Sequence, residues 1–288
     1  MAARKRAAAI HLKSRAEIDA IARSGAIISA LFAELEPRVR PGVTTVALDR
    51  FADTYIRSHD GAVPAFKGLY GFPGSACISV NAEVVHGIPR RRRLRQGDIV
   101  SIDVGVRQGG WCADSAYTFP VGEIGDDAAH ILAVTRDALR LAVAAARPGH
   151  HVGDIGAAVV NRVHGTGFAI IRDLVGHGVG RQIHEEPQVP NRGRAGRGVR
   201  LHTGMVLAIE PMLSAGTEEI VTLADRWTVT TADGRLSAHF EHTVAVTADG
   251  PAILTGGGIW DRSGAPNRGG QQPATGVGTR LTTTARNR

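Results

Sequence analysis

Lone carboxylates interrupt apolar runs that otherwise have the pattern of buried β-strands, and no other feature constrains the fold of this chain as much. Asp103 lies inside the β-rich run 99–106, Glu210 closes a later apolar run, and Glu241 immediately precedes another. An ionised acid in a buried strand is costly unless a compensating group lies beside it. The strands are therefore expected to bring their acids to a shared polar centre.

A fourth acid, Asp114, follows Asp103 in a second strand-like run. If Gln108 and Gly109 form a two-residue hairpin loop, Asp103 lies directly opposite Asp114, with Cβ atoms about 5 Å apart on one face. Two like charges in this arrangement either face solvent on a half-exposed hairpin or, when buried, share a proton, find cations or bind metal. The hairpin alone leaves both alternatives open.

An imidazole joins these acids in the second half of the chain. His177 stands between Gly176 and Gly178, where backbone and side chain can approach a centre closely. The four acids and His177 make a set of mostly hard oxygen ligands, which suits one or two divalent ions such as cobalt, manganese, iron or zinc.

Two similar pairs of helix signals suggest that the chain is built from two related halves. Ser14 begins a capping box before one helix, and Thr44 or Thr45 can cap the next. Residues 126–147 predict a third helix, and Asp154 can cap a fourth. An Arg-Pro-Gly sequence separates the two helices of each pair, although coincidence between two ordinary helix pairs is the alternative. Strands are expected within residues 75–120, 168–180, 205–213 and 219–246.

Length and composition limit the class of protein. The 288 residues, 43% of them hydrophobic, can bury a core in one large domain or two small ones. No run approaches the roughly 18 apolar residues of a membrane span, and the N-terminus lacks the apolar stretch of a secretory signal. Cys77 and Cys112 are too few for a disulfide framework. We therefore expect a cytoplasmic protein.

The net charge of +7 comes from the ends of the chain. Residues 1–15 carry +5 and residues 251–288 carry +4, which leaves −2 for residues 16–250. This distribution disfavours a nucleic-acid-binding fold, and with it specific DNA binding. We expect a flexible basic N-terminus over residues 1–10 and a largely disordered, basic, Gly- and Thr-rich tail over 251–288.

Six segments, in their order along the chain, resemble the type I methionine aminopeptidases, which are metallopeptidases with the pita-bread fold. The segments are Val84-Val85-His86-Gly87-Ile88-Pro89, Asp98-Ile99-Val100-Ser101-Ile102-Asp103-Val104-Gly105, Gly176-His177-Gly178-Val179-Gly180, His184-Glu185-Glu186-Pro187, Ile209-Glu210-Pro211-Met212 and Phe240-Glu241-His242-Thr243. The resemblance covers residues 11–250. It implies a single α+β metallo-aminopeptidase domain there, with two pseudo-symmetric halves and a central curved antiparallel sheet covered by helices.

The resemblance also implies the reaction and the metal ligands. The reaction is removal of the N-terminal methionine from nascent proteins, with a preference for a small second residue, by attack of a metal-bound water or hydroxide on the first peptide bond. Asp114 and Glu241 would bridge two ions, Asp103 would hold one of them, and His177 with Glu210 the other.

Three side chains carry further roles in the family. By the resemblance, Glu210 would also shuttle the proton from the attacking water to the leaving amine. His184 would stabilise the oxygen of the tetrahedral intermediate. His86 would contact the peptide nitrogen of the substrate.

An apolar pocket for the methionine side chain is also implied. Its wall would include Phe66, Leu69, Phe72, Cys77, Ile183 and Trp227. Leu69 and Phe72 stand where tyrosines are common in bacterial members, and Ile183 where an aromatic residue or methionine is common. These departures keep the pocket apolar but alter its shape. Family members also imply a monovalent cation held by backbone oxygens near Asn81 and Ser237.

Partners and rival functions complete the expectations. The arginine-rich runs 90–95 and 192–200 are either solvated loops or, for the first run, a docking patch for ribosomal RNA. We expect nascent polypeptide N-termini as substrates, a transient ribosome contact, no membrane partner and a monomer. A proline-directed aminopeptidase or dipeptidase of the same fold is one alternative. A non-catalytic binding relative is another, although such relatives usually lose ligands and this chain keeps all five.

Overall fold

The computed structural model describes residues 9–262. The helices are α1 (Arg15–Leu35), α2 (Thr45–Arg57), α3 (Asp126–Ala145), α4 (Val152–Val163) and α5 (Ile259–Arg262), with 3₁₀ turns η1 (Glu36–Arg38) and η2 (Leu69–Gly71). The strands are β1 (Ala62–Pro64), β2 (Ala76–Val80), β3 (Glu83–Val85), β4 (Ile99–Gln108), β5 (Trp111–Pro120), β6 (Ala169–Ile170), β7 (Val175–Gly178), β8 (Glu185–Pro190), β9 (Val206–Ile209), β10 (Met212–Ser214), β11 (Ile220–Thr222), β12 (Val229–Thr231), β13 (Ser237–His239), β14 (His242–Thr247) and β15 (Gly250–Ile253).

Helix starts follow the capping signals with one exception. The Ser14 hydroxyl accepts from the Glu17 N–H at 3.4 Å while the Glu17 carboxylate accepts from the Ser14 N–H at 2.8 Å, which confirms the capping box. Thr44 caps α2. The cap predicted at Asp154 is wrong, because α4 begins directly after His151. Asp154 lies one turn inside the helix, where its carboxylate accepts from the His151 N–H at 2.7 Å.

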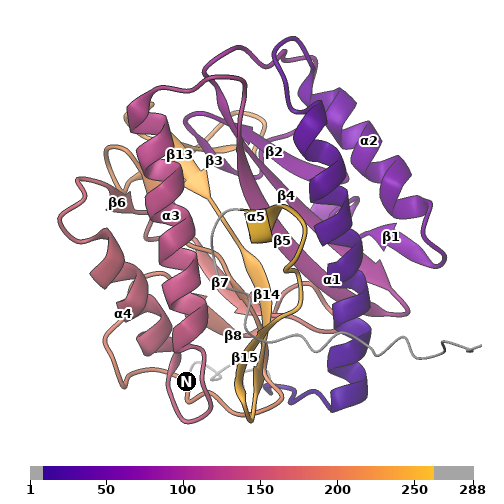
Figure 1. Cartoon of the computed structure of the whole chain (residues 1–288), viewed down its shortest axis with the longest axis vertical. Helices are drawn as coiled ribbons and strands as arrows, with labels where there is room; N and C mark the ends of the chain where they lie inside the picture. Colours follow the sequence, from indigo (N-terminus) through magenta and orange to yellow (C-terminus); the bar gives the residue numbers. More distant parts are fainter. Residues whose placement is uncertain (1–8, 263–288) are drawn as a thin grey trace, which may run out of the picture.

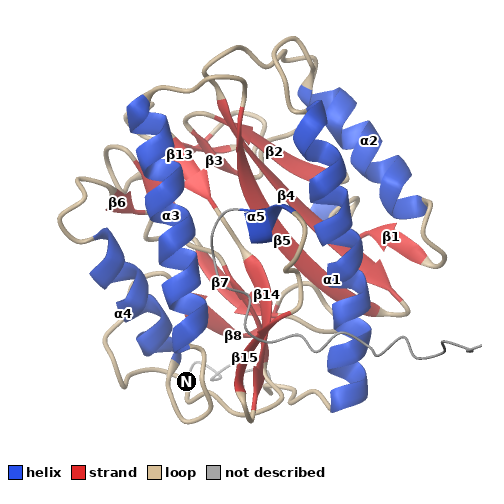
Figure 2. Cartoon of the chain, in the orientation of Figure 1, coloured by secondary structure: helices blue, strands red, loops and turns tan. Residues whose placement is uncertain are grey.

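The sheets belong to two halves that meet along β5 and β14. In the first half β4 pairs with β1, β2 and β5, and in the second the strand order is β15-β14-β9-β7-β8. Smaller sheets have the orders β13-β10-β6 and β11-β12-β3. Helices α1 and α2 cover one half and α3 and α4 the other, on the same side of the strands (Figures 1 and 2). This arrangement confirms the predicted α+β fold with two pseudo-symmetric halves.

Several hydrogen bonds join the halves at the point where the acids lie. The Asp114 N–H on β5 donates to Thr243 Oγ1 on β14 at 3.0 Å, and the Glu241 N–H donates to the Ala116 carbonyl at 2.9 Å. The backbone thus fixes Asp114 and Glu241 beside each other although they are far apart in the sequence.

The register of the β4–β5 hairpin differs from the predicted one. Gly109 and Gly110 form the loop, with φ of 59° and 81°, so Gln108 pairs with Trp111. Both loop positions have positive φ, a conformation that glycine adopts without steric cost. Asp114 therefore pairs with Gly105 rather than with Asp103. Because the shift is two residues, Asp103 and Asp114 still share one face as diagonal neighbours.

The fold extends further towards both ends than the sequence predicted. β15 pairs with β14, and Ile259 and Trp260 of α5 are buried, so residues 251–262 are not part of a tail. The apolar side chains of α5 find partners in the core, since the Trp260 ring lies 4.8 Å from that of Tyr117. Ile10 also packs against the core. The expected flexible residues 1–8 and tail residues 263–288 lie outside the described part of the chain.

We expect Gly25→Ala to destabilise the protein by about 1–3 kcal/mol, because an added Cβ would overlap the carbonyl oxygen of Leu254. Gly25 lies on α1, so the close approach ties this helix to the segment after β15. Urea unfolding measures the change, with Ala26→Ser on the exposed side of α1 as the control. Equal stability of the two variants would show that residues 251–262 do not pack as described.

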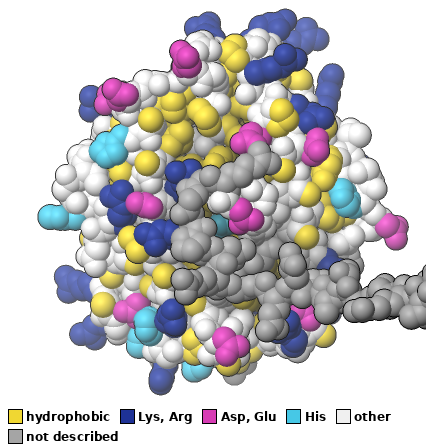
Figure 3. All heavy atoms as spheres, viewed as in Figure 1, with side chains coloured by type: hydrophobic (Ala, Val, Ile, Leu, Met, Phe, Trp, Pro, Cys, Tyr) yellow, Lys and Arg dark blue, Asp and Glu magenta, His cyan; other side chains and the backbone are white. Residues whose placement is uncertain are grey.

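The described surface carries dispersed charge. On the face shown in Figure 3, lysine and arginine side chains lie mostly around the edge with acidic side chains between them. Within residues 9–262, no helix combines the length and the apolar character needed to cross a bilayer.

Candidate metal centre and active site

A cavity of about 270 Å³ lies between the two halves and collects most of the predicted site residues. Its wall is formed by Phe66, Leu69, Tyr70, Phe72, Cys77, Val85, His86, Asp103, Asp114, Leu174, Val175, His177, His184, Glu210, Met212, Trp227 and Glu241. All five predicted metal ligands are among them. The acids therefore face one shared cavity instead of the outer surface, which removes the half-exposed hairpin as an alternative.

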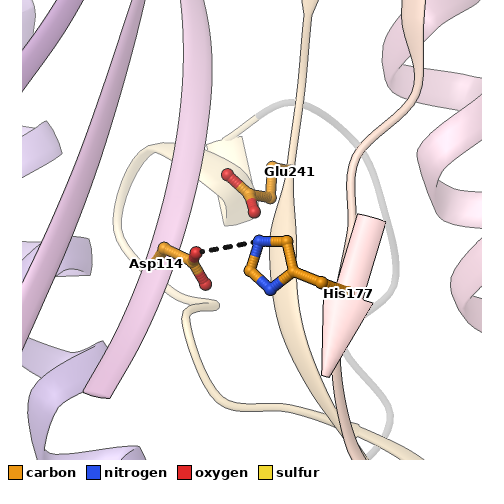
Figure 4. Close-up of side chains that lie close together, drawn as sticks. All are labelled: Asp114, His177 and Glu241. Carbon is orange, nitrogen blue, oxygen red and sulfur yellow. Dashed lines mark ion pairs between the residues drawn. The ribbon is translucent and has the colours of Figure 1, made fainter. Parts of the chain in front are cut away.

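Asp114, His177 and Glu241 form the tightest group of potential ligands. Their ligand atoms all lie within 4.8 Å of one another, and Asp114 Oδ2 is 3.5 Å from His177 Nε2. Figure 4 shows the three side chains converging from β5, β7 and the residue before β14. Such spacing matches donors that share an ion.

The flanking glycines and one hydrogen bond orient His177. A Cβ on Gly176 would overlap the Ala208 carbonyl oxygen, and one on Gly178 would overlap that of Glu186, so only glycine fits on either side. His177 Nδ1 lies 2.9 Å from the Gly178 carbonyl oxygen. A carbonyl only accepts, so Nδ1 carries the proton and Nε2 presents its lone pair to the acids. Burial lowers the pKa of His177, which keeps the ring neutral.

Glu210 and Asp103 complete the set. Glu210 follows β9 directly, and its Oε1 lies 3.5 Å from His177 Nε2. Asp103 projects from β4, where its Oδ1 is buried and has no hydrogen-bond partner. A buried oxygen without a donor is costly, so this atom points to a cation that it would bind.

The electrostatics of the acids support the same conclusion. Burial raises the pKa of Asp103, Glu210 and Glu241 well above the usual range, and the carboxylate of Asp114 raises each further. Burial also raises the pKa of Asp114 to about 6. No lysine or arginine among the described residues lines the cavity to balance these charges. One or two divalent ions would supply the missing positive charge, and the donors present fit them.

Two further histidines reach the cavity. His86, directly after β3, has a φ of 57° and lies edge-to-face against Trp227, with ring centres 6.5 Å apart. The His184 ring lies 4.5 Å from that of His177 and is stacked on Tyr70. Burial lowers the pKa of both His86 and His184, so each is a neutral imidazole at pH 7 that can donate or accept a hydrogen bond.

The apolar wall contains five of the six predicted pocket residues. Phe66, Leu69, Phe72, Cys77 and Trp227 line the cavity, and the Phe72 and Trp227 rings meet edge-to-face at 5.2 Å. Ile183 does not line it, which corrects that prediction. Its side chain is 2% exposed and packs into the hydrophobic core, whereas the neighbouring His184 faces the cavity.

Sequence reasoning missed several residues at the site. Tyr70 lines the cavity although it is 77% exposed, and it has a φ of 51°. The only sequence signal for its place at the site is that it follows the predicted pocket residue Leu69. His239 is buried near the acids, with its Nε2 3.7 Å from Glu210 Oε2, and burial lowers its pKa to about 3. Further cavity residues not predicted are Val85, Leu174, Val175 and Met212.

Comparison with known proteins agrees with this geometry. The profile described as "Metallopeptidase family M24" matches residues 19–248. "Methionine aminopeptidase" from Clostridium perfringens is 49% identical over 246 residues, which span 85% of this chain and 98% of that protein. "Methionine aminopeptidase 1" from Bacillus subtilis is 46% identical over 243 residues, spanning 84% and 98%.

Solved structures give the same result. The crystal structure of methionine aminopeptidase from Rickettsia prowazekii has a TM-score of 0.84 and 38% identity, covering 86% of this chain and 100% of that one. A Xaa-Pro dipeptidase from Bacillus anthracis has a TM-score of 0.70 at 21% identity and covers 85% and 61%, a likeness of fold alone. The chain therefore belongs to metallopeptidase family M24. Within that family, its relatives place it among the methionine aminopeptidases.

Proposed function

We propose that this chain removes the N-terminal methionine from nascent polypeptides by hydrolysing the first peptide bond, with a preference for a small second residue. The observation that carries this proposal is the convergence of four carboxylates and His177 at one cavity that also has an apolar wall. The flexible thioether side chain of methionine suits a wall of Phe72, Cys77 and Trp227. The sequence identity of this chain to proteins named methionine aminopeptidase supports the same reaction.

Asp103, Asp114, His177, Glu210 and Glu241 would hold one or two divalent ions. When bound, such ions supply Lewis-acid polarisation and lower the pKa of water. Glu210 takes the proton of the attacking water and passes it to the leaving amine. His184 donates a hydrogen bond to the oxygen that gains charge in the transition state, and His86 contacts the peptide nitrogen.

Metal removal should abolish the activity, and restoring a suitable ion should return it. We expect the chelated protein to release no methionine from the peptide Met-Ala-Ser, and manganese, iron, cobalt or zinc, added singly, to restore release to different extents. Free methionine is measured after each addition, with magnesium as the matched divalent control. Full activity in the chelated protein would contradict a metal-dependent mechanism.

The same assay separates this reaction from its alternatives. A proline-directed aminopeptidase or dipeptidase cleaves Xaa-Pro peptides, and a binding relative cleaves neither substrate. Cleavage confined to Xaa-Pro bonds would therefore replace the proposed function. Absence of any cleavage with every ion would favour the non-catalytic relative.

The proposal extends to cofactor and partners. The proposal includes a monovalent cation held by backbone oxygens near Asn81 and Ser237, which lie side by side because the Ser237 N–H donates to the Asn81 carbonyl at 2.9 Å. A cytoplasmic monomer that acts on nascent chains would make transient contact with the ribosome. Arg91 and Arg95 are exposed and available for that contact.

The other three arginines of this run are engaged within the chain. The guanidinium of Arg93 donates to the Gly42 carbonyl at 2.8 Å. Arg90 and Arg92 both bind the buried carboxylate of Glu83, the latter at 3.0 Å. The docking patch therefore rests on only part of the arginine run.

A further inference from the structure

Lys13 is a buried cation outside the cavity. Its side chain is 1% exposed, and no other lysine or arginine within residues 9–261 is buried. Its Nζ donates to Glu185 Oε2 at 2.7 Å, and its backbone N–H donates to the Gly204 carbonyl at 2.7 Å. The Ser14 capping box of α1 follows at once, so Lys13 projects from a fixed backbone.

The partner of Lys13 also fixes the loop between β7 and β8. Glu185 Oε1 accepts from the Gln182 N–H at 3.1 Å, and the carboxylate packs so closely on Gly180 that no Cβ fits there. Burial alone would raise the pKa of Glu185, but the hydrogen bonds from Lys13 and Gln182 outweigh it and lower the pKa. Glu185 is therefore ionised at pH 7, and its two oxygens connect this loop to the segment before α1.

The residue before Glu185 is His184. His184 is the last residue before β8, and its ring faces the cavity, whereas the carboxylate of Glu185 faces Lys13. We propose that Lys13 and Glu185 form a positioning pair that holds the backbone from which His184 reaches the substrate. This inference rests on the role given to His184 in the proposed function.

Stability alone does not account for the pair. Removing an ammonium and a carboxylate from water offsets much of their attraction, and buried pairs replaced by apolar groups of similar size often lose no stability. The reaction rate is more sensitive than stability to such a pair, because a displacement of about 1 Å at a reacting group can slow a reaction roughly 100-fold. The pair therefore matters more for where His184 lies than for how stably the chain folds.

The double variant Lys13→Met/Glu185→Gln tests the proposal. Lys13→Met alone leaves the partly buried carboxylate of Glu185 without its cation and is expected to unfold more readily. Adding Glu185→Gln removes that charge and returns the melting temperature towards its original value. With saturating metal, we expect kcat of the double variant on Met-Ala-Ser to fall roughly 10- to 100-fold and KM to change little, because His184 acts in the transition state.

A second measurement does not depend on activity. The His184 ring proton resonance, assigned by its loss in His184→Gln, is expected to be single in the unaltered metal-free protein and broadened or split in the double variant. Arg15→Met is the matched control, because Arg15 makes an exposed ion pair with Asp19 and should change neither readout. Glu185→Gln alone keeps an acceptor for Lys13, so it should shift both readouts less than the double variant.

The outcomes separate this inference from the proposed function. A double variant with restored stability, unchanged kcat and one unshifted His184 resonance overturns the positioning role. If the unaltered protein cleaves no peptide with any ion, the proposed reaction fails, and the resonance alone then decides whether the pair positions His184.

Discussion

Glu241→Gln is expected to abolish metal-dependent methionine release while leaving the metal-free protein at least as stable as the unaltered chain. Glu241 is 2% exposed. Burial is the main cause that raises its pKa, and the carboxylates of Asp114, Glu210 and Asp103 raise it further. A neutral amide of the same size relieves this repulsion. It also removes an anion that would bridge the ions. Loss of several kcal/mol of charge stabilisation corresponds to a rate roughly 1,000-fold lower.

Two measurements check this result together. In the unaltered chain an ion that binds only the folded state should raise the melting temperature, and in Glu241→Gln most of that rise should disappear. Methionine release from Met-Ala-Ser gives the rate. Glu186→Gln is the matched control, because Glu186 is an exposed acid outside the cavity wall. Wild-type turnover in Glu241→Gln would remove this residue from the ligand set.

Burial cost alone indicated the acids of the site. Asp103 lies inside an apolar strand, whereas Glu210 and Glu241 lie directly at the end of one and the start of another. The structure places all three at one cavity with Asp114 and His177. This works because an uncompensated buried charge is rare, whatever the fold around it. Which ion each residue would hold came from the family resemblance, since spacing along a chain carries no information about bridging.

The hairpin register could not be read from the sequence with the same certainty. The two-residue loop could be Gln108-Gly109 or Gly109-Gly110. The strand pairings that these loops produce differ by two residues, so both keep Asp103 and Asp114 on one face. Positive φ at both loop residues favours Gly109 and Gly110. The prediction of a shared face was therefore safer than the prediction of direct opposition.

Residues that act through tertiary packing were the hardest to predict. Ile183 has the apolar character of a pocket residue, yet it turns into the core while its neighbour His184 faces the cavity. The segment after Gly250 looked too polar to bury itself, but Ile259 and Trp260 are buried in a core that other elements provide. The composition of a segment indicates only what that segment can do by itself. The direction of Ile183 and the burial of Ile259 and Trp260 depend on the elements that pack against them.

Glu210→Gln is the second change with a large expected effect, and it separates metal binding from proton transfer. The amide oxygen of glutamine can stay beside His177 Nε2, where Glu210 Oε1 lies at 3.5 Å, and can still bind an ion. It cannot take a proton from water and pass it to the leaving amine. We therefore expect kcat to fall roughly 100- to 10,000-fold while much of the metal-induced rise in melting temperature remains.

The contrast between glutamine at the two positions decides the roles of these acids. Glu241→Gln should lose the thermal shift together with turnover, and Glu210→Gln should lose mainly turnover, since only Glu210 is proposed to move a proton. Rates measured at saturating metal on Met-Ala-Ser, with thermal shifts across a metal titration, give both quantities for each variant. If Glu210→Gln stays within about tenfold of the unaltered kcat, the loss is below the range for general acid–base catalysis and another group must carry the proton. The neutral His184 imidazole would then be a candidate, because it lines the same cavity with its ring 4.5 Å from that of His177.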